Sequence, residues 1–334
     1  MGRVDISKIR YDVIAVLSSG AQMNLNNVAV NVAWEENETE LAARLNLTLR
    51  DLKTGGASLA EQLPLGTAIL LYYSDGDTSD ECFRGTVWEW GNPRVNDDEI
   101  TLTAYDMLYY LNKSKDYGYW EAGKSTRSIV EEILGGWSVP LGKFTGPSIT
   151  HEKVMYKNKA ISAMLQETME EAKKQTGTGY IIRASKGKCE ILSRGENSEI
   201  WCFTQDTNLT SASDKLTMAD LITKVIVIGK DDDQGKGRPE IEQTLTGETQ
   251  YGTLQEIVTR GSSTEEEAKS QAEGILKDKG KPKRSIVLRS PDFPRIRKGD
   301  KIRVILDRLD GYFLVKTVSH NATAMQMQME VEPT

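Results

Sequence analysis

The sequence predicts a mainly β protein in which two barrel-like antiparallel β domains flank a small α+β domain. Three observations lead to this prediction. Apolar and polar residues alternate with the period of a strand in both end regions, helical periodicity is concentrated in the middle, and one order of strands occurs twice. The 334 residues, 38% hydrophobic and 27% charged, suit a soluble globular protein of two or three domains. We expect these domains at residues 1–112, 113–221 and 222–334.

The first predicted domain, residues 1–112, consists of strands and turns. Leu45, Leu47 and Leu49 alternate with polar residues, which places the three leucines on one face of a strand. Further strands are predicted at 68–73, 83–90 and 100–104, with polar loops between them. A meander of this kind forms a sandwich or a small barrel.

The middle domain, residues 113–221, is predicted to hold two helices and a hairpin. Ser125 is a candidate N-cap for the first helix, which ends at residues 135–136. The apolar stripe of that helix is Ile129, Val130, Ile133 and Leu134. The second helix is expected from about residue 158 to 175, and strands at 180–184 and 189–193 are expected to form the hairpin.

The last domain, residues 222–334, returns to the strand pattern. A strand is predicted at 225–228, and a helix capped by Ser263 is predicted at 264–279. In the final strand, one face is expected to carry Met325, Met327, Met329 and Val331.

The chain also contains an internal repeat. Segments 66–73, 83–90 and 99–104 have the same order as segments 299–306, 312–320 and 325–332. Each set has a strand that begins at a glycine, a return strand that opens with an aromatic residue, and a third strand with strict alternation. The repeat predicts a duplicated β module, which is more typical of an assembly protein than of an enzyme.

A phosphate-binding pattern occurs once. Gly118, Gly123, Lys124 and Ser125 satisfy G-x-x-x-x-G-K-[ST]. In a true phosphate loop the first glycine follows a buried strand, whereas here it follows polar and charged residues. Glu121, inside the loop, would repel phosphate. We interpret the match as coincidental and expect no nucleotide cofactor, which leaves a nucleotide-binding protein as a remote alternative.

Other catalytic or metal-binding residues are sparse. The chain has two histidines, His151 and His320, and three cysteines that lie far apart and form no C-x-x-C pair. The acidic run 231–233 lacks the spacing of a calcium loop. We therefore expect no catalytic residues, no metal site and no cofactor, and we predict that the protein is not an enzyme.

The net charge of -7 argues against specific binding of nucleic acid. The longest apolar run near the start, residues 13–17, is far shorter than a signal-peptide core, so we expect synthesis in the cytoplasm and no membrane anchor.

One segment, residues 277–303, reverses the charge balance with eleven Lys or Arg against three Asp. It is expected to be either a solvated surface or a face towards an acidic partner or a channel. The candidate residues for that face are Lys281, Lys283, Arg284, Arg289, Arg295, Arg297 and Lys298.

Several stretches resemble one phage family. They are residues 104–111, 123–134, 160–165 and 218–227, followed by the ending 299–304, 318–320 and 325–328. The chain resembles the tail-hub proteins of phages, of defective prophages of Bacillus and of contractile bacteriocins. The resemblance covers nearly the whole chain and carries no catalytic signature.

This resemblance implies a structural baseplate protein with two similar β-barrel domains in each chain. Three chains would then form a ring of six similar modules, which joins the sixfold tail tube to the threefold central spike. The partners implied are other copies of the chain, the tube protein, the spike and the baseplate-wedge proteins. The protein would be a component of the assembled tail or bacteriocin particle.

A second interpretation is a tail-associated module that binds cell wall or carbohydrate, or a hydrolase. This interpretation predicts a groove with exposed aromatic residues, for which the candidates are Trp88, Trp90, Trp120 and Trp137.

Overall fold

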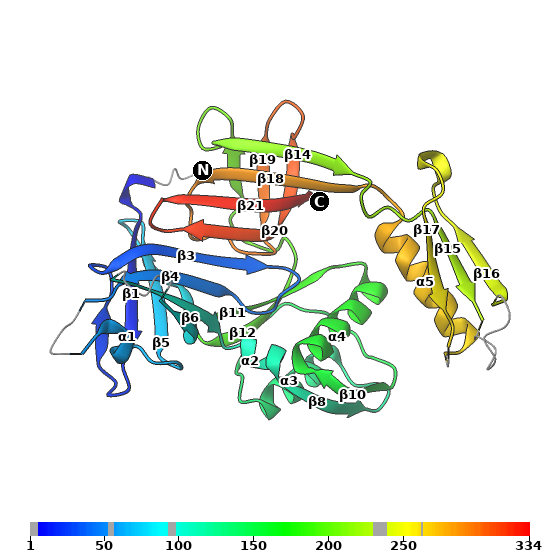
Figure 1. Ribbon diagram of the computed structural model, residues 1–334, viewed down its shortest axis with the longest axis horizontal. Coiled ribbons are helices and arrows are strands. Elements are labelled where there is room, and N and C mark those ends of the chain that lie inside the picture. Colours follow the sequence, from blue (N-terminus) through cyan, green and yellow to red (C-terminus); the bar gives the residue numbers. More distant parts are fainter. Residues whose placement is uncertain (1–5, 53–56, 93–97, 230–238, 262) are drawn as a thin grey trace. The chain divides into compact units, whose positions relative to one another are not determined.

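The structure is a computed structural model that describes residues 6–52, 57–92, 98–229, 239–261 and 263–334 (Figure 1). The chain forms two compact units, of which the first combines Met1–Ala212 with Val287–Thr334 and the second is Ser213–Ile286. The expected boundaries at residues 112 and 221 differ from this division. The difference arises because strands from the two ends of the chain pair with each other in the first unit.

The N-terminal part of the first unit is an antiparallel meander with a buried leucine face. Its strands are β1 (Arg10–Val16), β2 (Gln22–Asn24), β3 (Ala29–Asn37), β4 (Arg44–Arg50), β5 (Ala68–Ser74), β6 (Ser79–Gly91) and β7 (Glu99–Asp106). Two short helices, η1 (Ile6–Lys8) and α1 (Leu59–Gln62), accompany them. Leu45, Leu47 and Leu49 are all buried, which confirms the predicted face of this strand. Neighbouring strands in this part of the sheet follow the order β4-β7-β6-β5-β1-β2.

The C-terminal strands continue the same sheet. They are β13 (Trp201–Thr204), β18 (Lys283–Pro291), β19 (Lys301–Ile305), β20 (Gly311–Asn321) and β21 (Gln326–Pro333). Strand β20 pairs with β3 in antiparallel register, with His320 opposite Trp34, and Figure 1 shows the two strands side by side. The chain passes to the second unit along β14 (Ser211–Thr217) and returns along β18.

In the part of the chain that the structure describes, this sheet has 13 strands, and its main path is β14-β18-β21-β20-β3-β4-β7-β6-β5-β1-β2. The mainly β class is therefore confirmed. Over the described residues the path does not return to its first strand, so the sheet is open, and the two expected barrel-like domains are antiparallel meanders that do not close into barrels. The physical reason is that β3 uses its second edge to pair with β20, which joins the two meanders instead of closing either one.

The repeated order of strands is present as two antiparallel meanders, β5-β6-β7 and β19-β20-β21. In the last strand, Met327, Met329 and Val331 are buried as predicted. Met325 precedes β21 and has a positive φ of 53°, so it belongs to the turn and not to the alternating face.

The middle of the chain packs as an α+β layer within the first unit. Its elements are α2 (Tyr109–Lys113), β8 (Lys115–Trp120), α3 (Thr126–Gly136), β9 (Leu141–Phe144), β10 (Val154–Ala160), α4 (Ile161–Thr176), β11 (Tyr180–Ser185) and β12 (Lys188–Ser193). Ser125 is the N-cap of α3 and accepts the Ser128 N–H, and the predicted apolar stripe of α3 is buried. The β11–β12 hairpin is also confirmed.

The second helix begins later than expected. Residues 154–160 form strand β10, because they pair with β8, and α4 starts only at Ile161. Helical periodicity in this stretch is overridden by a long-range strand pairing.

The described residues of the second unit form a three-stranded sheet covered by one helix. Its elements are β15 (Lys224–Ile228), β16 (Ile241–Thr246), η2 (Thr249–Tyr251), β17 (Gln255–Thr259) and α5 (Glu265–Lys279). The core contains Val225, Val227 and Val258 from the sheet and Ala268 and Ala272 from α5. The predicted strand at 225–228 is confirmed.

The N-cap of α5 is Thr264, one residue later than the predicted Ser263. Thr264 accepts the Glu267 N–H while the Glu267 carboxylate accepts the Thr264 N–H, which completes a capping box. A serine in the preceding position cannot make this reciprocal pair with Glu267.

Candidate functional site

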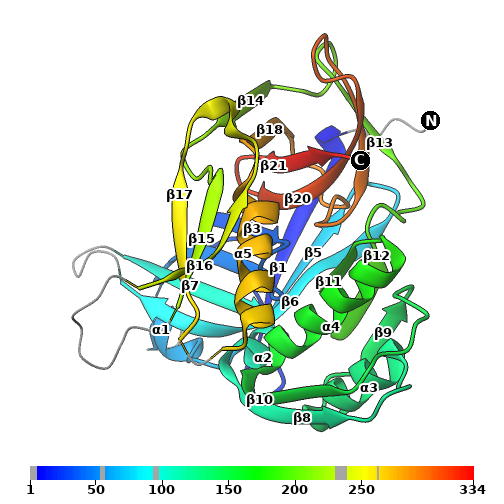
Figure 2. The same ribbon diagram turned by 90° about the vertical axis from the view of Figure 1, so that its right-hand side faces the viewer.

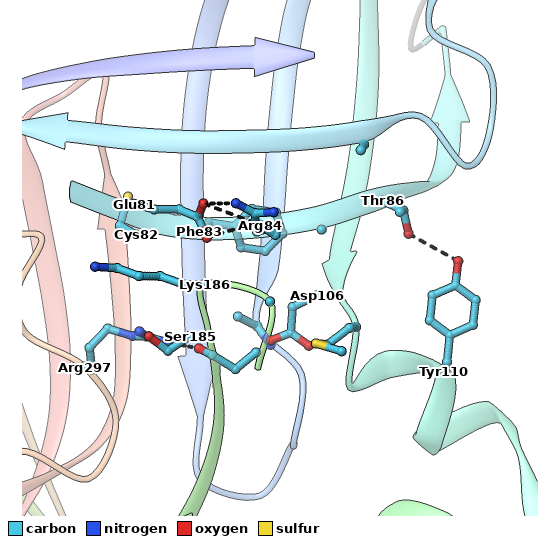
Figure 3. Close-up of a pocket in the computed structure, with 16 residues that line it drawn as sticks. Glu81, Cys82, Phe83, Arg84, Thr86, Asp106, Tyr110, Ser185, Lys186 and Arg297 are labelled. Atoms are coloured by element: carbon cyan, nitrogen blue, oxygen red, sulfur yellow. Dashed lines mark hydrogen bonds and ion pairs between the residues drawn. The ribbon is translucent and has the colours of Figure 1, made fainter. Parts of the chain in front are cut away.

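The first unit contains a cavity of about 280 Å³ between strand β6 and the turn of the β11–β12 hairpin (Figure 3). Its lining is mainly apolar. The lining residues are Ala43, Ala68, Glu81, Cys82, Phe83, Arg84, Gly85, Thr86, Asp106, Met107, Tyr110, Ala184, Ser185, Lys186, Gly187 and Arg297. A largely apolar cavity with a few polar groups is the usual form of a binding site.

The polar side chains that line this cavity form hydrogen bonds or ion pairs with other residues of the protein. Glu81 accepts hydrogen bonds from Arg84 at 2.6 and 3.1 Å, and Lys186 forms an ion pair with Asp80 at 2.6 Å. The Cys82 thiol donates to the Leu71 carbonyl at 3.3 Å, and burial raises its pKa far above the ordinary value. A thiol that stays protonated is a poor nucleophile.

Asp106 is a buried acidic residue in the lining of this cavity. Its two carboxylate oxygens accept the N–H groups of Ala43 and Leu108, both at 2.8 Å. Burial raises the pKa of Asp106 to about 6, although the two backbone N–H groups oppose that rise. Among the lining residues no nucleophile lies beside a free base, so the arrangement suits packing or binding of an apolar group rather than covalent chemistry.

Next to this cavity lies a buried ionic cluster made of Glu36, Arg297 and Lys298. Arg297 donates to both oxygens of Glu36, at 2.6 Å from Nε and 2.5 Å from Nη2. Burial acts to raise the pKa of Glu36, but the charge and hydrogen bonds of Arg297 outweigh it and lower the pKa to about 2. Arg297 also donates to the Ala184 carbonyl at 2.9 Å, so the ion pair ties the hairpin to the sheet.

Lys298 is the third member of this buried ionic cluster. Its Nζ donates to the carbonyls of Glu40 at 2.6 Å, Leu41 at 2.8 Å and Asn37 at 3.3 Å. Burial lowers the pKa of Lys298 to about 8. The three carbonyls belong to the turn between β3 and β4, so the lysine fixes that turn from the C-terminal part of the chain.

A second buried network joins three distant segments. Tyr11 donates to Asp292 at 2.5 Å, and His320 Nδ1 lies 2.6 Å from the other oxygen of Asp292. His320 Nε2 is 3.0 Å from the Ile296 carbonyl, and the ring stacks on Trp34 at 4.1 Å. Both ring nitrogens therefore have a hydrogen-bond partner inside the core. His320 is therefore a structural residue of the core.

His151 is also buried and structural. Its Nε2 lies 2.8 Å from the Thr126 hydroxyl, and burial lowers its pKa.

Glu36 and Asp106 were not identified as buried acidic residues from the sequence, although the alternation of their two strands contains a sign of them. Val32, Trp34 and Glu36 occupy successive inward positions of β3, and Asp106 takes the inward position after Leu102 and Ala104 on β7. An acidic residue at a position where alternation predicts an apolar one points to a buried ionic contact.

The residues of the phosphate-binding pattern do not share one loop. Gly118 lies inside strand β8, and a Cβ at that position would come within 2.5 Å of the Trp120 ring. Gly123 turns the chain with a φ of 89°. Lys124 forms an ion pair with Glu132 at 2.7 Å, and Ser125 caps α3.

The basic segment 277–303 is not one surface. Lys281, Lys283, Arg284 and Arg289 are exposed, whereas Lys298 is buried. Arg295 forms an ion pair with Asp75 at 2.7 Å. The expectation that Arg297 and Lys298 face a partner or channel is corrected, because both charges are used inside the first unit.

The four candidate tryptophans differ in their surroundings. Trp88 packs against Tyr109 and Tyr110, and Trp120 is buried and donates to Glu132 at 2.7 Å. Trp90 and Trp137 are exposed, on β6 and directly after α3 respectively.

The described part of the chain holds no group of three or more His, Cys, Asp or Glu side chains arranged for a metal ion. The acidic run 231–233 lies outside the described residues. Within those residues, every helix is too short or too polar to cross a bilayer.

Comparison with known proteins identifies relatives in Bacillus subtilis (strain 168). The uncharacterized protein YqbQ is 28% identical over 201 residues, and the phage-like element PBSX protein XkdQ is 27% identical over 194 residues. These matches cover 58% and 55% of this chain, and 60% and 58% of the two relatives. The chain thus matches about three fifths of the length of each relative.

Solved structures share the fold over nearly the whole chain. The 43 kDa tail protein of prophage MuSo2 from Shewanella oneidensis has a TM-score of 0.67 at 12% identity, covering 96% of this chain and 98% of that one. The E. coli c3393 protein has a TM-score of 0.52 at 11% identity, covering 92% and 74%. It is described as a type VI secretion component with structural similarity to the T4 tail proteins gp27 and gp5.

The fold is thus that of prophage tail proteins. A sequence family described as YQBQ-like matches residues 32–332, which is most of the chain, and the protein belongs to that family.

Proposed function

We propose that the protein is a structural component of a contractile phage tail or a related bacteriocin particle, in which it forms the baseplate hub. Three copies form a ring that joins the sixfold tail tube to the threefold central spike. The chain is made in the bacterial cytoplasm and is then incorporated into the particle. Family membership and the tail-protein fold support this proposal.

The observation that carries the proposal is the pair of meanders, β5-β6-β7 and β19-β20-β21, in one sheet. A ring of three chains with two similar modules each presents six similar modules to a sixfold partner, while the chain itself repeats only three times. Cyclic assembly of identical chains is the ordinary route to such a ring.

The buried ionic cluster supports the same role. Glu36, Arg297 and Lys298 connect β3, the β3–β4 turn and the hairpin to the start of the C-terminal meander. A joint of this kind keeps the two modules at a constant spacing, which a symmetry adaptor requires. The cavity near β6 favours a structural role as well, because its polar groups are occupied by internal contacts.

The first test measures the molar mass of the complex that the purified chain forms in solution. Light scattering on the purified full chain, alone and mixed with the tube and spike proteins of the same particle, is expected to give three copies per complex. A stoichiometry of one copy at every concentration, with both partners present, would contradict the hub. Interfaces of ~1,600 Å² are typical for such stable contacts.

The exposed part of the basic segment is proposed to contact an acidic neighbour in the particle. Charge reversal at Lys281, Lys283, Arg284 and Arg289 is expected to lower the yield of intact tails. Normal yield would show that these side chains form a solvated surface.

A further inference from the structure

Strands β8 and β10 form a two-stranded ribbon with one buried and one exposed face. Within the described residues the two strands pair only with each other, and Figure 2 shows them side by side at the bottom of the view. Trp120 and Tyr156 point to the core formed by α3 and α4. This buried face stabilises the ribbon, since two strands alone are only marginally stable in water.

The opposite face of the ribbon is aromatic and apolar at its centre. Tyr117 is 77% exposed, Tyr119 47% and Met155 55%. Tyr119 lies directly opposite Met155 across the strand pair, and Tyr117 precedes it by two residues on the same face. Single exposed apolar residues are common on soluble proteins, but three neighbours on one face of a ribbon form a patch.

Lysines surround this centre. Lys153 Nζ lies 5.1 Å from the centroid of the Tyr119 ring. Lys115 and Lys157 are exposed, and neither side chain has an ion pair or hydrogen bond within the described residues. We call Lys115, Tyr117, Tyr119, Lys153, Met155 and Lys157 the ribbon face.

The acidic groups near the ribbon face leave it basic. Glu121 accepts a hydrogen bond from the Tyr119 hydroxyl at 2.5 Å. Asp116 accepts the Tyr117 N–H at 2.8 Å, and its position in the strand points away from the ribbon face. Glu152 is exposed in the loop before β10. With Glu121 and Glu152 both counted against the three lysines, a local excess of one positive charge remains.

We propose that the ribbon face binds an extended acidic segment of a partner protein. Apolar side chains of that segment cover Tyr117, Tyr119 and Met155, and its carboxylates meet the three lysines. Tyrosine and methionine are enriched at protein interfaces, which fits the centre of the ribbon face. Glu121 within the patch and the net charge of -7 disfavour a nucleic acid, whose phosphates repeat without interruption. The inference does not depend on the hub role.

The test uses the full chain and a labelled synthetic peptide of alternating glutamate and valine, followed by fluorescence anisotropy at low and high salt. Two variants change the ribbon face, Tyr117→Ser with Tyr119→Ser, and Lys115→Glu with Lys153→Glu and Lys157→Glu. The matched control is Lys215→Glu with Lys269→Glu and Lys277→Glu, which makes the same change of charge at exposed positions in the second unit.

We expect each ribbon variant to bind the peptide about tenfold more weakly, while the control changes by less than about twofold. Circular dichroism melting curves are expected to be unchanged, since the replaced side chains are exposed. Absence of binding by the unmodified protein, or binding by both ribbon variants that equals that of the unmodified protein, would overturn the proposal. Tighter binding of an oligothymidylate than of the peptide would also overturn it, because the face would then be a nucleic-acid site.

Discussion

Arg284 and Arg297 belong to the same basic segment and make the same kind of contact in different surroundings. Arg284 donates to both oxygens of Asp214, at 2.8 and 2.7 Å, and Arg297 donates to both oxygens of Glu36. The Arg284 side chain is 44% exposed and that of Asp214 35%, whereas Arg297 is 14% exposed and Glu36 0%.

The comparison shows that geometry alone does not determine the importance of an ion pair. When one partner of the exposed pair is removed, water solvates the other at little cost. When Glu36 is removed, the Arg297 charge stays in the interior with no partner. Arg284 can therefore exchange Asp214 for an acidic group of a neighbouring protein at little cost. The pair of Arg297 and Glu36 instead stabilises the fold.

The largest effect is expected from Glu36→Gln. We expect the free energy of unfolding to fall by ~3–5 kcal/mol, since an unpaired buried arginine remains. Urea titration measures the change. Asp214→Asn serves as the control, and equal losses in the two variants would contradict the distinction between the pairs.

A double variant sharpens this result. Replacing Glu36 by Gln and Arg297 by Met removes both charges, so the added loss from the second change is expected to be small or negative. If the two losses simply add, the ion pair is not the reason for the first one.

The pH dependence provides the next test. The folded pKa of Glu36 is about 2, below its ordinary value of 4.5, so its stabilising contribution is complete above pH 4.5 and is lost as the pH falls towards 2. The difference in stability between the unmodified protein and Glu36→Gln is therefore expected to shrink between pH 4.5 and 2.5. Urea midpoints at these pH values, and at pH 7, measure it.

Asp106 acts in the opposite direction. Burial raises its pKa to about 6 from 3.8, so its contribution is complete below pH 3.8 and is lost as the pH rises through 6. This change is smaller in Glu36→Gln, because the charge of Glu36 is one cause of the raised pKa of Asp106, so the comparison is made between pH 4.5 and 2.5. A stability difference that widened within that range would contradict the ionic role of Glu36.

An intermediate effect is expected from Ser125→Ala. The Ser125 hydroxyl accepts the Ser128 N–H at 3.1 Å at the start of α3, and loss of such a cap costs ~1 kcal/mol. Thermal unfolding by circular dichroism detects the change. Ser125→Asp, which retains an acceptor, is expected to preserve the stability.

The smallest effects are expected at exposed ion pairs. Arg284→Ala and Lys124→Ala are each expected to change stability by less than ~1 kcal/mol, since both pairs lie at the surface. A larger loss for Lys124→Ala would contradict the interpretation of its pair with Glu132 as a weak surface contact. A phosphate contact would instead appear as binding of a labelled nucleotide that Lys124→Ala weakens.

The local features were predictable because they depend on neighbours in the chain. The leucine alternation in β4, the cap and apolar stripe of α3 and the β11–β12 hairpin each follow from periods or caps of a few residues. The start of α4 at Ile161 was not predictable in this way, since residues 154–160 form a strand only by pairing with β8.

In the candidate site, too, the features that depend on chain neighbours were predictable and those that depend on distant contacts were not. The basic segment was visible as a run of charges, but which of its members are buried was not. Arg297 and Glu36 lie 261 positions apart. The inward position of Glu36 in the alternation of β3 was the one available local sign, and it does not identify the partner.

The sequence by itself determined the mainly β class, several of the strands, the cap of α3 and the repeated order of strands, because these depend on contacts within a few residues. Only the tertiary structure decided that β3 pairs with β20, that the sheet stays open and that residues 213–286 form a separate unit. It also decided which charges of the basic segment lie in the interior. The reason is that strand partners and burial are set by contacts between distant segments, and these contacts exist only once the chain has folded.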